Sequence, residues 1–203
     1  MNVGKRVKLF IVMLLVFSRI TAQAINQSAK YQILVWGMNI GEFTVEQKTE
    51  NEDVSVKAVT DVHIRMIINY RVKYVQQSFH RQGVLLTSRV ETLKNGRINS
   101  DTQLEKQGDK YLLNKDGEST VIGGLITYSG SLLYFNEPKQ IYNLYNERNG
   151  ERNSIRNVDA HTYATLDKKG NRSNVYVYQD GILMRAELIH SLAIIHLRRI
   201  LQD

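Results

Sequence analysis

The chain has 203 residues, of which 42% are hydrophobic, and its 27 Lys and Arg against 20 Asp and Glu give a net charge of +7. Four of the basic side chains lie in the first 24 residues, so residues 25–203 carry 23 basic and 20 acidic side chains, a net charge of +3. Such a small excess, spread without a block of Lys and Arg, excludes the phosphate-neutralising surface of a nucleic-acid-binding protein.

The N-terminal segment has the three parts of an export signal. Lys5, Arg6 and Lys8 give a cationic start, residues 9–17 (LFIVMLLVF) form an apolar run, and residues 22–24 (AQA) form a small-residue cleavage site. The apolar run is too short to span a bilayer. We therefore expect a signal peptide at residues 1–24 and a mature protein that is soluble in the periplasm or secreted.

The absence of cysteine limits how the exported protein is held together and attached. The fold must depend on its core and its hydrogen bonds, because no disulfide can form. No cysteine follows the signal to carry a lipid, so we expect no stable membrane anchor after cleavage. Residues 25–203 contain no Pro- or Ser-rich linker, and we expect them to form one domain.

Alternating polarity predicts long amphipathic strands. Over residues 54–66 the even positions are mostly apolar and the odd ones mostly polar, and a similar alternation resumes over residues 68–74. Turn signals such as Asn95-Gly96, Asp116-Gly117 and Asp180-Gly181 punctuate the chain, because these residues readily adopt the positive φ of tight hairpin turns. We predict an all-β fold, a single antiparallel meander of about ten to twelve strands that curls into a half-barrel, β-sandwich or barrel.

The C-terminal third is apolar or aromatic on both faces, over residues 175–178 and 188–197, which favours central strands. The apolar positions switch from even to odd numbers near Ile189 and His190, which predicts a bulge or bend in the strand. A short helix over residues 191–199 is the competing interpretation.

Catalytic and metal-binding patterns are weak. The five histidines form no H-x-H or H-E-x-x-H arrangement, so we expect surface or sheet-lining histidines, no metal and no cofactor. Residues 129–131 (SGS) lack the G-x-S-x-G elbow of a serine hydrolase, and we expect a turn there. We assign no catalytic residue, and an enzyme is the less favoured interpretation.

The most distinctive string is residues 132–138 (LLYFNEP), which contains the only proline of the chain. We predict an aromatic strand that ends at Pro138, with Glu137 accepting hydrogen bonds from neighbouring backbone amides. The functional interpretation is the rim of a ligand cavity. The candidate ligand-binding residues are Tyr134, Phe135, Glu137, Pro138, Tyr176 and Tyr178.

The order of several strings resembles one family of exported proteins. The strings are Ile40-Gly41, residues 79–85 (FHRQGVL), 90–96 (VETLKNG), 133–138 (LYFNEP) and 174–181 (NVYVYQDG). They are similar to small exported proteins of Gram-negative bacteria that share domain of unknown function number 6134. The resemblance covers nearly the whole mature chain and implies an exported antiparallel β protein, without implying an activity.

Three functional hypotheses remain open. The leading one is a non-enzymatic envelope or secreted protein whose curled sheet binds an apolar or amphipathic ligand such as a lipid. The second is a structural or interaction module that contacts another envelope protein through the polar strand face of Lys57, Asp61, His63, Arg65, Arg71 and Lys73. The third is a hydrolase of envelope polymers that uses Glu137, His161 or Tyr163.

Overall fold

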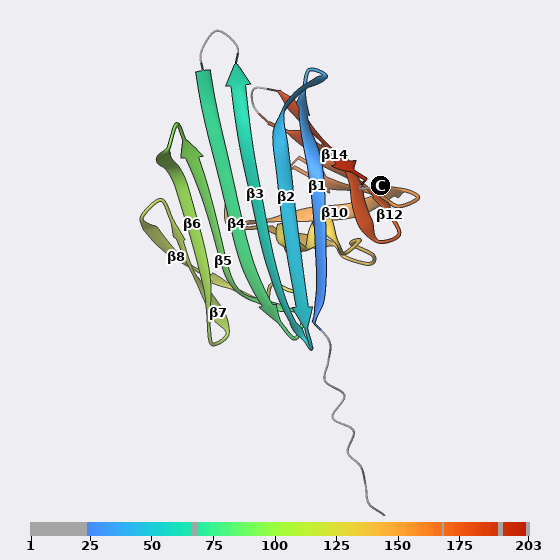
Figure 1. Ribbon diagram of the computed structural model, residues 1–203. Helices are drawn as coiled ribbons and strands as arrows, with labels where there is room; N and C mark the ends of the chain where they lie inside the picture. The colour runs from blue at the N-terminus through green and yellow to red at the C-terminus, as the bar shows by residue number, and fades with distance from the viewer. Residues whose placement is uncertain (1–23, 66–68, 168, 191–192, 202–203) are drawn as a thin grey trace, which may run out of the picture.

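The computed structural model describes residues 24–65, 69–167, 169–190 and 193–201. In this part of the chain 14 strands form one antiparallel sheet, which confirms the all-β fold class (Figure 1). The count exceeds the predicted ten to twelve because some strands have only four to six residues, as in β9 and β11, which is too short for a clear alternation. The predicted signal segment lies outside the described residues except for Ala24.

The strands fall into two consecutive groups, here called the first and second arms. The first arm consists of β1 (Ile25–Val35), β2 (Met38–Glu50), β3 (Asp53–Arg65), β4 (Asn69–Arg81), β5 (Val84–Lys94), β6 (Arg97–Gln107), β7 (Lys110–Lys115) and β8 (Glu118–Gly123). The second arm consists of β9 (Asn143–Asn146), β10 (Glu151–Asp159), β11 (Thr162–Leu166), β12 (Arg172–Gln179), β13 (Ile182–Ile189) and β14 (Ile194–Ile200).

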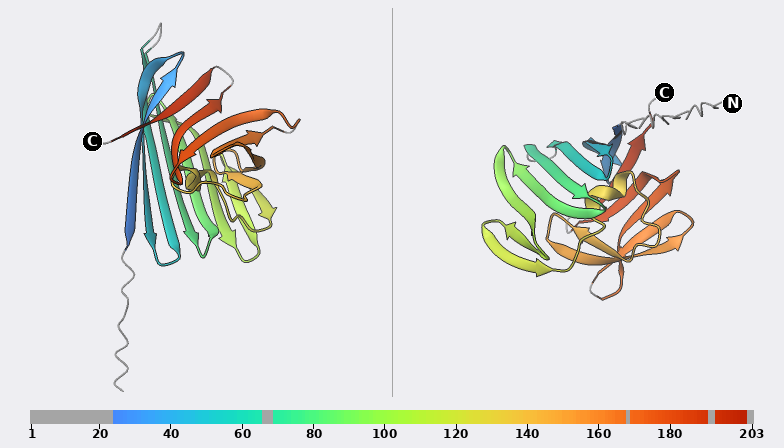
Figure 2. Two further views of the ribbon diagram at one scale, coloured as in Figure 1. Left: turned by 90° about the vertical axis from the view of Figure 1, so that its right-hand side faces the viewer. Right: turned by 90° about the horizontal axis from the view of Figure 1, so that it is seen from below.

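Each arm is a meander, and the two arms meet at the first and last strands. The order across the sheet runs from β8 to β1, then from β14 to β9, so β1 pairs with β14 and the edges are β8 and β9. The sheet curls until its two arms face each other without closing (Figure 2). The expected half-barrel shape follows from the length and twist of the strands, since β2, β3 and β4 have 13 residues each.

The two sequence signals used for the first arm are confirmed. The even positions of β3 point to the interior, where Val56, Ala58 and Val62 are buried. Asn95 and Asp116 have φ values of 50° and 53° in the turns that they form with the following glycine, and Asp180 has a φ of 51° in the corresponding turn of the second arm. Period-two alternation and Asn-Gly or Asp-Gly turns therefore account for most of this arm.

The C-terminal third differs from the prediction. The apolar positions switch near Ile189 because the chain reverses there: β13 ends at Ile189, and His190 and Ala193 exchange two backbone hydrogen bonds before β14 begins. A bulge within one strand was expected. The competing helix over residues 191–199 is wrong, since residues 194–200 form a strand that pairs with both β13 and β1.

The connection between the arms enters the interior of the curled sheet. It contains a 3-10 helix, η1 (Gly130–Tyr134), followed by residues 135–138, and we call residues 130–138 the plug (Figure 2). The prediction of an aromatic strand at residues 132–135 is wrong, because this segment forms a tight helical turn. Its apolar side chains stand in adjacent positions, which suits packing on several sides. Leu133 and Phe135 are buried in the main hydrophobic core with residues of both arms.

Candidate functional site

The aromatic residues predicted to line a ligand cavity lie in the interior and pack on one another. The ring centroid of Tyr134 is 5.0 Å from that of Phe43 and 6.3 Å from that of Tyr31. Tyr176 and Tyr178 project inward from β12, where burial raises the pKa of Tyr176 to about 12 and raises that of Tyr178 well above its usual value. In this conformation the plug itself covers the aromatic part of the concave face.

Glu137 is the centre of a second cluster, at the end of the plug. Its carboxylate Oε1 accepts hydrogen bonds from the Tyr163 hydroxyl at 2.9 Å and from His161 Nδ1 at 3.0 Å, and Lys139 Nζ lies 3.5 Å from Oε2. The expected hydrogen bonds to neighbouring backbone amides are replaced by these side-chain contacts. The adjoining Pro138 is fully buried. The structure thus joins Glu137, His161 and Tyr163, the three residues named for a hydrolase.

The electrostatics of this cluster keep Glu137 ionised. Burial alone would raise the pKa of Glu137, but the hydrogen bonds from Tyr163 and His161, with the charge of Lys139, outweigh burial and lower the pKa. Burial and the Glu137 carboxylate raise the pKa of Tyr163, so this hydroxyl stays protonated and donates. The His161 side chain is exposed and is therefore the group of this cluster that solvent reaches.

A buried polar network, which the sequence analysis missed, attaches the plug to the sheet. Ser131 Oγ accepts a hydrogen bond from Ser78 on β4 at 2.7 Å, and its Oγ lies 2.9 Å from Ser129 Oγ. Ser129 Oγ is in turn 3.2 Å from His80 Nε2. Residues 129–131 were expected to be a simple turn, yet both hydroxyls are fully buried.

Glu147 holds the plug from the opposite side. Its carboxylate accepts hydrogen bonds from the amides of Gly130 at 2.9 Å and Ser131 at 3.0 Å. A side chain at Gly130 would bring its Cβ to 2.9 Å from Glu147 Oε2, which explains the glycine. Burial raises the pKa of Glu147, with hydrogen bonds from Ser129 and Ser131 opposing that shift, and burial lowers the pKa of His80 to about 4. Enclosed in this way, the network anchors the plug and lies out of reach of a substrate.

The concave face between the plug and the end of the sheet where β1 turns into β2, the upper end in Figure 1, is apolar. Ile40, Val72, Leu188 and Ile195 are only partly buried there and pack against the same core as the plug. Strands β1 and β2 rise well beyond η1 in this direction (Figure 1). The structure therefore leaves a shallow apolar surface inside the curl, above the plug.

The rim of this surface carries large exposed apolar side chains. Trp36 is 66% exposed, Met38 50%, Ile189 57% and Ile194 47%. Val35 pairs with both Met38 and Ile195, so Met38 points to the same side as Ile195, into the curl. Ile189 and Ile194 pair with each other one position beyond Leu188 and Ile195, so they point to the outer side of the sheet. The sequence analysis missed Trp36 and Met38. The available signal was Trp36 in a Trp-Gly hairpin turn, a position that usually holds a small polar residue.

The strand face proposed for partner binding is exposed to solvent where it is described. Arg71 forms two hydrogen bonds with Asp61, at 2.6 and 3.0 Å, across β3 and β4. Lys57 and Lys73 are exposed on the same strands. The side chains of His63 and Arg65 lie outside the described residues.

Among the described residues, no group of three or more His, Asp or Glu side chains is placed to hold a metal ion. Over the same part of the chain, no helix has the length and hydrophobicity needed to cross a membrane.

Comparisons with known proteins show a similar fold and identify the family. The chain is similar to the crystal structure of a beta-barrel-like protein of domain of unknown function DUF1849 from Brucella abortus, with a TM-score of 0.57 and 10% identity over 88% of this chain and 97% of that chain. At this identity the likeness shows the fold alone. No curated protein matches the chain. A family model described as domain of unknown function DUF6134 matches residues 31–200, so the chain belongs to this family.

Proposed function

We propose that this protein is a non-enzymatic, exported binding protein that holds an apolar or amphipathic ligand, such as a lipid, on the concave face above the plug. The observation that carries the proposal is the partly buried apolar face of Ile40, Val72, Leu188 and Ile195, whose rim carries the exposed side chains of Trp36 and Met38. Soluble proteins seldom leave large contiguous apolar patches exposed unless the patch binds something.

The plug forms the base, here called the floor, of this apolar surface. Tyr134 packs on Tyr31 and Phe43, so a ligand would meet a closed aromatic layer under the apolar walls of β1, β2, β4, β13 and β14. Such a site buries one side of a ligand and leaves the other in water, which suits an amphipathic molecule whose polar group stays solvated. The earlier candidates Tyr176 and Tyr178 lie in this core and support the floor from below.

Native mass spectrometry of mature protein, purified from the envelope fraction of its host, tests the proposal. We expect an intact mass above that of the polypeptide, which organic extraction returns to the polypeptide mass. The double variant Trp36→Ser/Met38→Ser should lose most of the extractable mass. The control Ile98→Ser removes an apolar side chain that is 65% exposed near the start of β6, and it should retain the ligand.

Two results would contradict the proposal. One is a bare polypeptide mass for freshly prepared protein that also fails to take up added phosphatidylglycerol or palmitate. The other is equal ligand loss in the rim variant and in Ile98→Ser.

Export is supported by the sequence of residues 1–24. N-terminal sequencing of the protein from fractionated cells should begin at Ile25, in the periplasmic fraction or the medium. Recovery of chains that begin at Met1 in the cytoplasm would contradict export.

A second candidate function is acid–base catalysis, which the cluster of Glu137, His161 and Tyr163 favours. A buried carboxylate that holds Nδ1 of an exposed imidazole is the arrangement that orients a general base. Hydrolysis of envelope polymers should then fall at least 100-fold in both Glu137→Gln and His161→Ala. Equal turnover in both variants and the wild type would remove this function.

A further inference from the structure

The outer face of the first arm carries an open furrow that none of the functions above uses. Ser78 points to the interior, where it contacts Ser131 of the plug, so its neighbours Gln77 and Phe79 point outward. Two open grooves of about 510 and 580 Å³ lie on this outward face, and both include Gln77 and Ser78. They therefore form one continuous furrow across the strands.

The strand register explains the furrow. Outward side chains at two levels of the sheet form two parallel rows across β2 to β7, and the buried residues between them contribute only backbone to the floor. The first row is Glu46, Lys57, Gln77, Arg89, Gln103 and Asn114. The second row is Lys48, Ser55, Phe79, Thr87, Glu105 and Leu112. Six strands spaced about 4.8 Å apart make the furrow roughly 24 Å long.

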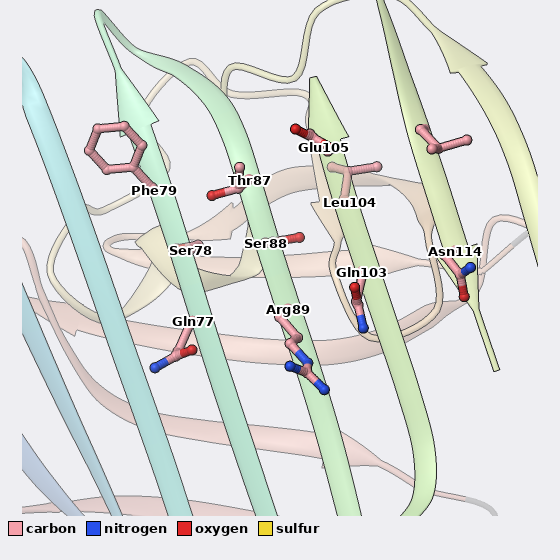
Figure 3. A pocket seen from close by; sticks show the side chains of 11 residues that line it. Gln77, Ser78, Phe79, Thr87, Ser88, Arg89, Gln103, Leu104, Glu105 and Asn114 are labelled. Carbon is pink, nitrogen blue, oxygen red and sulfur yellow. The ribbon is translucent and has the colours of Figure 1, made fainter. Parts of the chain in front are cut away.

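The two walls differ in chemistry at the β4–β7 end. The first row presents the amides of Gln77, Gln103 and Asn114 and the guanidinium of Arg89, all planar hydrogen-bonding groups (Figure 3). The second row presents Phe79, half-buried at one end of the groove with the Arg81 guanidinium 5.3 Å from its ring centroid, followed by Thr87, Glu105 and Leu112. One side of a bound molecule would thus meet planar hydrogen-bonding groups, while the other meets a mixed wall with apolar side chains at its two ends.

The furrow carries little net charge. Its lining contains three basic side chains and two acidic ones. Arg89 is paired with Glu91 at 2.7 Å and with Asp101 at 3.2 Å, and Lys48 is paired with Glu50 at 3.0 Å. A polyanion would find no unpaired cationic stripe here, so an uncharged ligand fits best.

We propose that this furrow binds an uncharged oligosaccharide chain. A pyranose ring has hydroxyl groups around its edge and C–H groups on its faces, which match the amide wall and the Phe79 ring respectively. Side-chain amides and the guanidinium can each engage hydroxyls with more than one hydrogen bond. The length of the furrow suits several consecutive sugar units of a linear polymer.

An extended peptide fits the furrow less well. Peptides that bind β-sheets usually add to an edge, where backbone groups are free. The furrow crosses the middle of the sheet, and β2 to β7 are paired on both sides. Recognition here depends on side chains alone. The proposal is independent of the ligand site above the plug, because it concerns the opposite face of the sheet.

The test is an NMR titration of ¹⁵N-labelled mature protein with the hexamer of N-acetylglucosamine, with maltohexaose and cellohexaose as further probes. We expect saturable shifts of the side-chain amides of Gln77, Gln103 and Asn114 with at least one hexamer. The double variant Gln77→Ala/Gln103→Ala should weaken binding at least tenfold, and Phe79→Leu should weaken it about fivefold while the fold is kept. The matched control Gln107→Ala/Gln179→Ala removes two exposed glutamines outside the furrow and should bind as the wild type does.

Three outcomes would overturn the proposal. They are the absence of shifts with all three hexamers at 10 mM, equal weakening in the control, and equal shifts of the same amides with an uncharged Gly-Ser peptide of similar length. Native mass spectrometry of the rim variants is unaffected by any of them, so failure of this proposal is distinguishable from failure of the ligand site above the plug.

Discussion

Among single residues, His80 makes the stability of the fold depend on pH. Burial lowers its pKa to about 4 in the folded protein, against about 6.5 when unfolded, so between these values the unfolded chain binds a proton that the folded chain does not. His80 therefore costs no stability above pH 7, and the free energy of unfolding falls as pH drops from 6.5 towards 4. At pH 4.5 we expect a loss of about 2.5 kcal/mol from this residue.

Urea unfolding at pH 7.5 and pH 4.5 measures this effect in the wild type and in His80→Gln. Between the two pH values, the free energy of unfolding should fall more in the wild type than in the variant, by about 2.5 kcal/mol. The same loss in both proteins would show that His80 is protonated in the folded state or does not control the pH dependence.

Glu137 contributes stability with the opposite pH dependence. Its folded-state pKa is lowered, so its contribution is present above the ordinary carboxyl range and is lost as pH falls through the folded pKa. Glu137→Gln should destabilise the protein by about 2 kcal/mol at pH 7, because charged hydrogen bonds to Tyr163 and His161 are lost.

The difference between the Glu137 variant and the wild type should shrink at pH 3, in unfolding followed by circular dichroism. Glu118→Gln, an exposed position at the start of β8, is the control and should change stability by less than about 0.5 kcal/mol. A Glu137→Gln protein as stable as the wild type at pH 7 would contradict the derived role of this cluster.

Among the elements, the pairing of β2 with β3 depends on one close backbone approach. A Cβ at Gly41 would lie 2.5 Å from the carbonyl oxygen of Asp61 on β3, where backbone must move to make room. Gly41→Ala should therefore destabilise the protein by about 3 kcal/mol. Gly123→Ala is the control, since nothing lies within 4 Å of its Cβ position, and thermal unfolding of both variants checks the difference. Equal melting temperatures would contradict the close approach.

The elements also show which parts of the secondary structure the sequence patterns could predict. The alternation over residues 54–66 predicted β3, because the residues of a strand that is buried on one face must alternate. Residues 132–135 failed as a strand because a short apolar run is equally compatible with a tight helix packed on several sides. The true neighbours of Tyr134 are Tyr31 and Phe43, which come from strands about 90 to 100 residues away in the sequence.

Sites assembled from distant segments are the part that the sequence could not predict. The cluster at the end of the plug joins Glu137 with His161 and Tyr163, three residues singled out in advance without knowledge that they touch. The network of His80 and Ser129 contains no motif, because its spacing of 49 residues depends on where the plug enters the sheet. The furrow likewise requires the register of six strands.

In the whole molecule, Arg152 links the two arms near their free edges. From β10 its guanidinium donates to the carbonyls of Gly124 at 2.7 Å, Leu125 at 3.1 Å and Gly123 at 3.2 Å, just after β8. Arg152→Ala should let the edges separate. Native-state hydrogen exchange should then show faster exchange in β7 and β8, by about tenfold, while β2 and β3 exchange as in the wild type. Uniform acceleration, or none, would contradict a local link.

The seam between β1 and β14 has a consequence for how the molecule assembles. Each arm pairs only neighbouring strands, so most of the sheet can form by closing short loops at low entropic cost. The exception is the pairing of Lys30 with Ile200 and of Val35 with Ile195, which joins segments at opposite ends of the described chain. Folding thus reduces to two local processes and one distant docking step, and the slowest event is expected to be the encounter of two preformed halves.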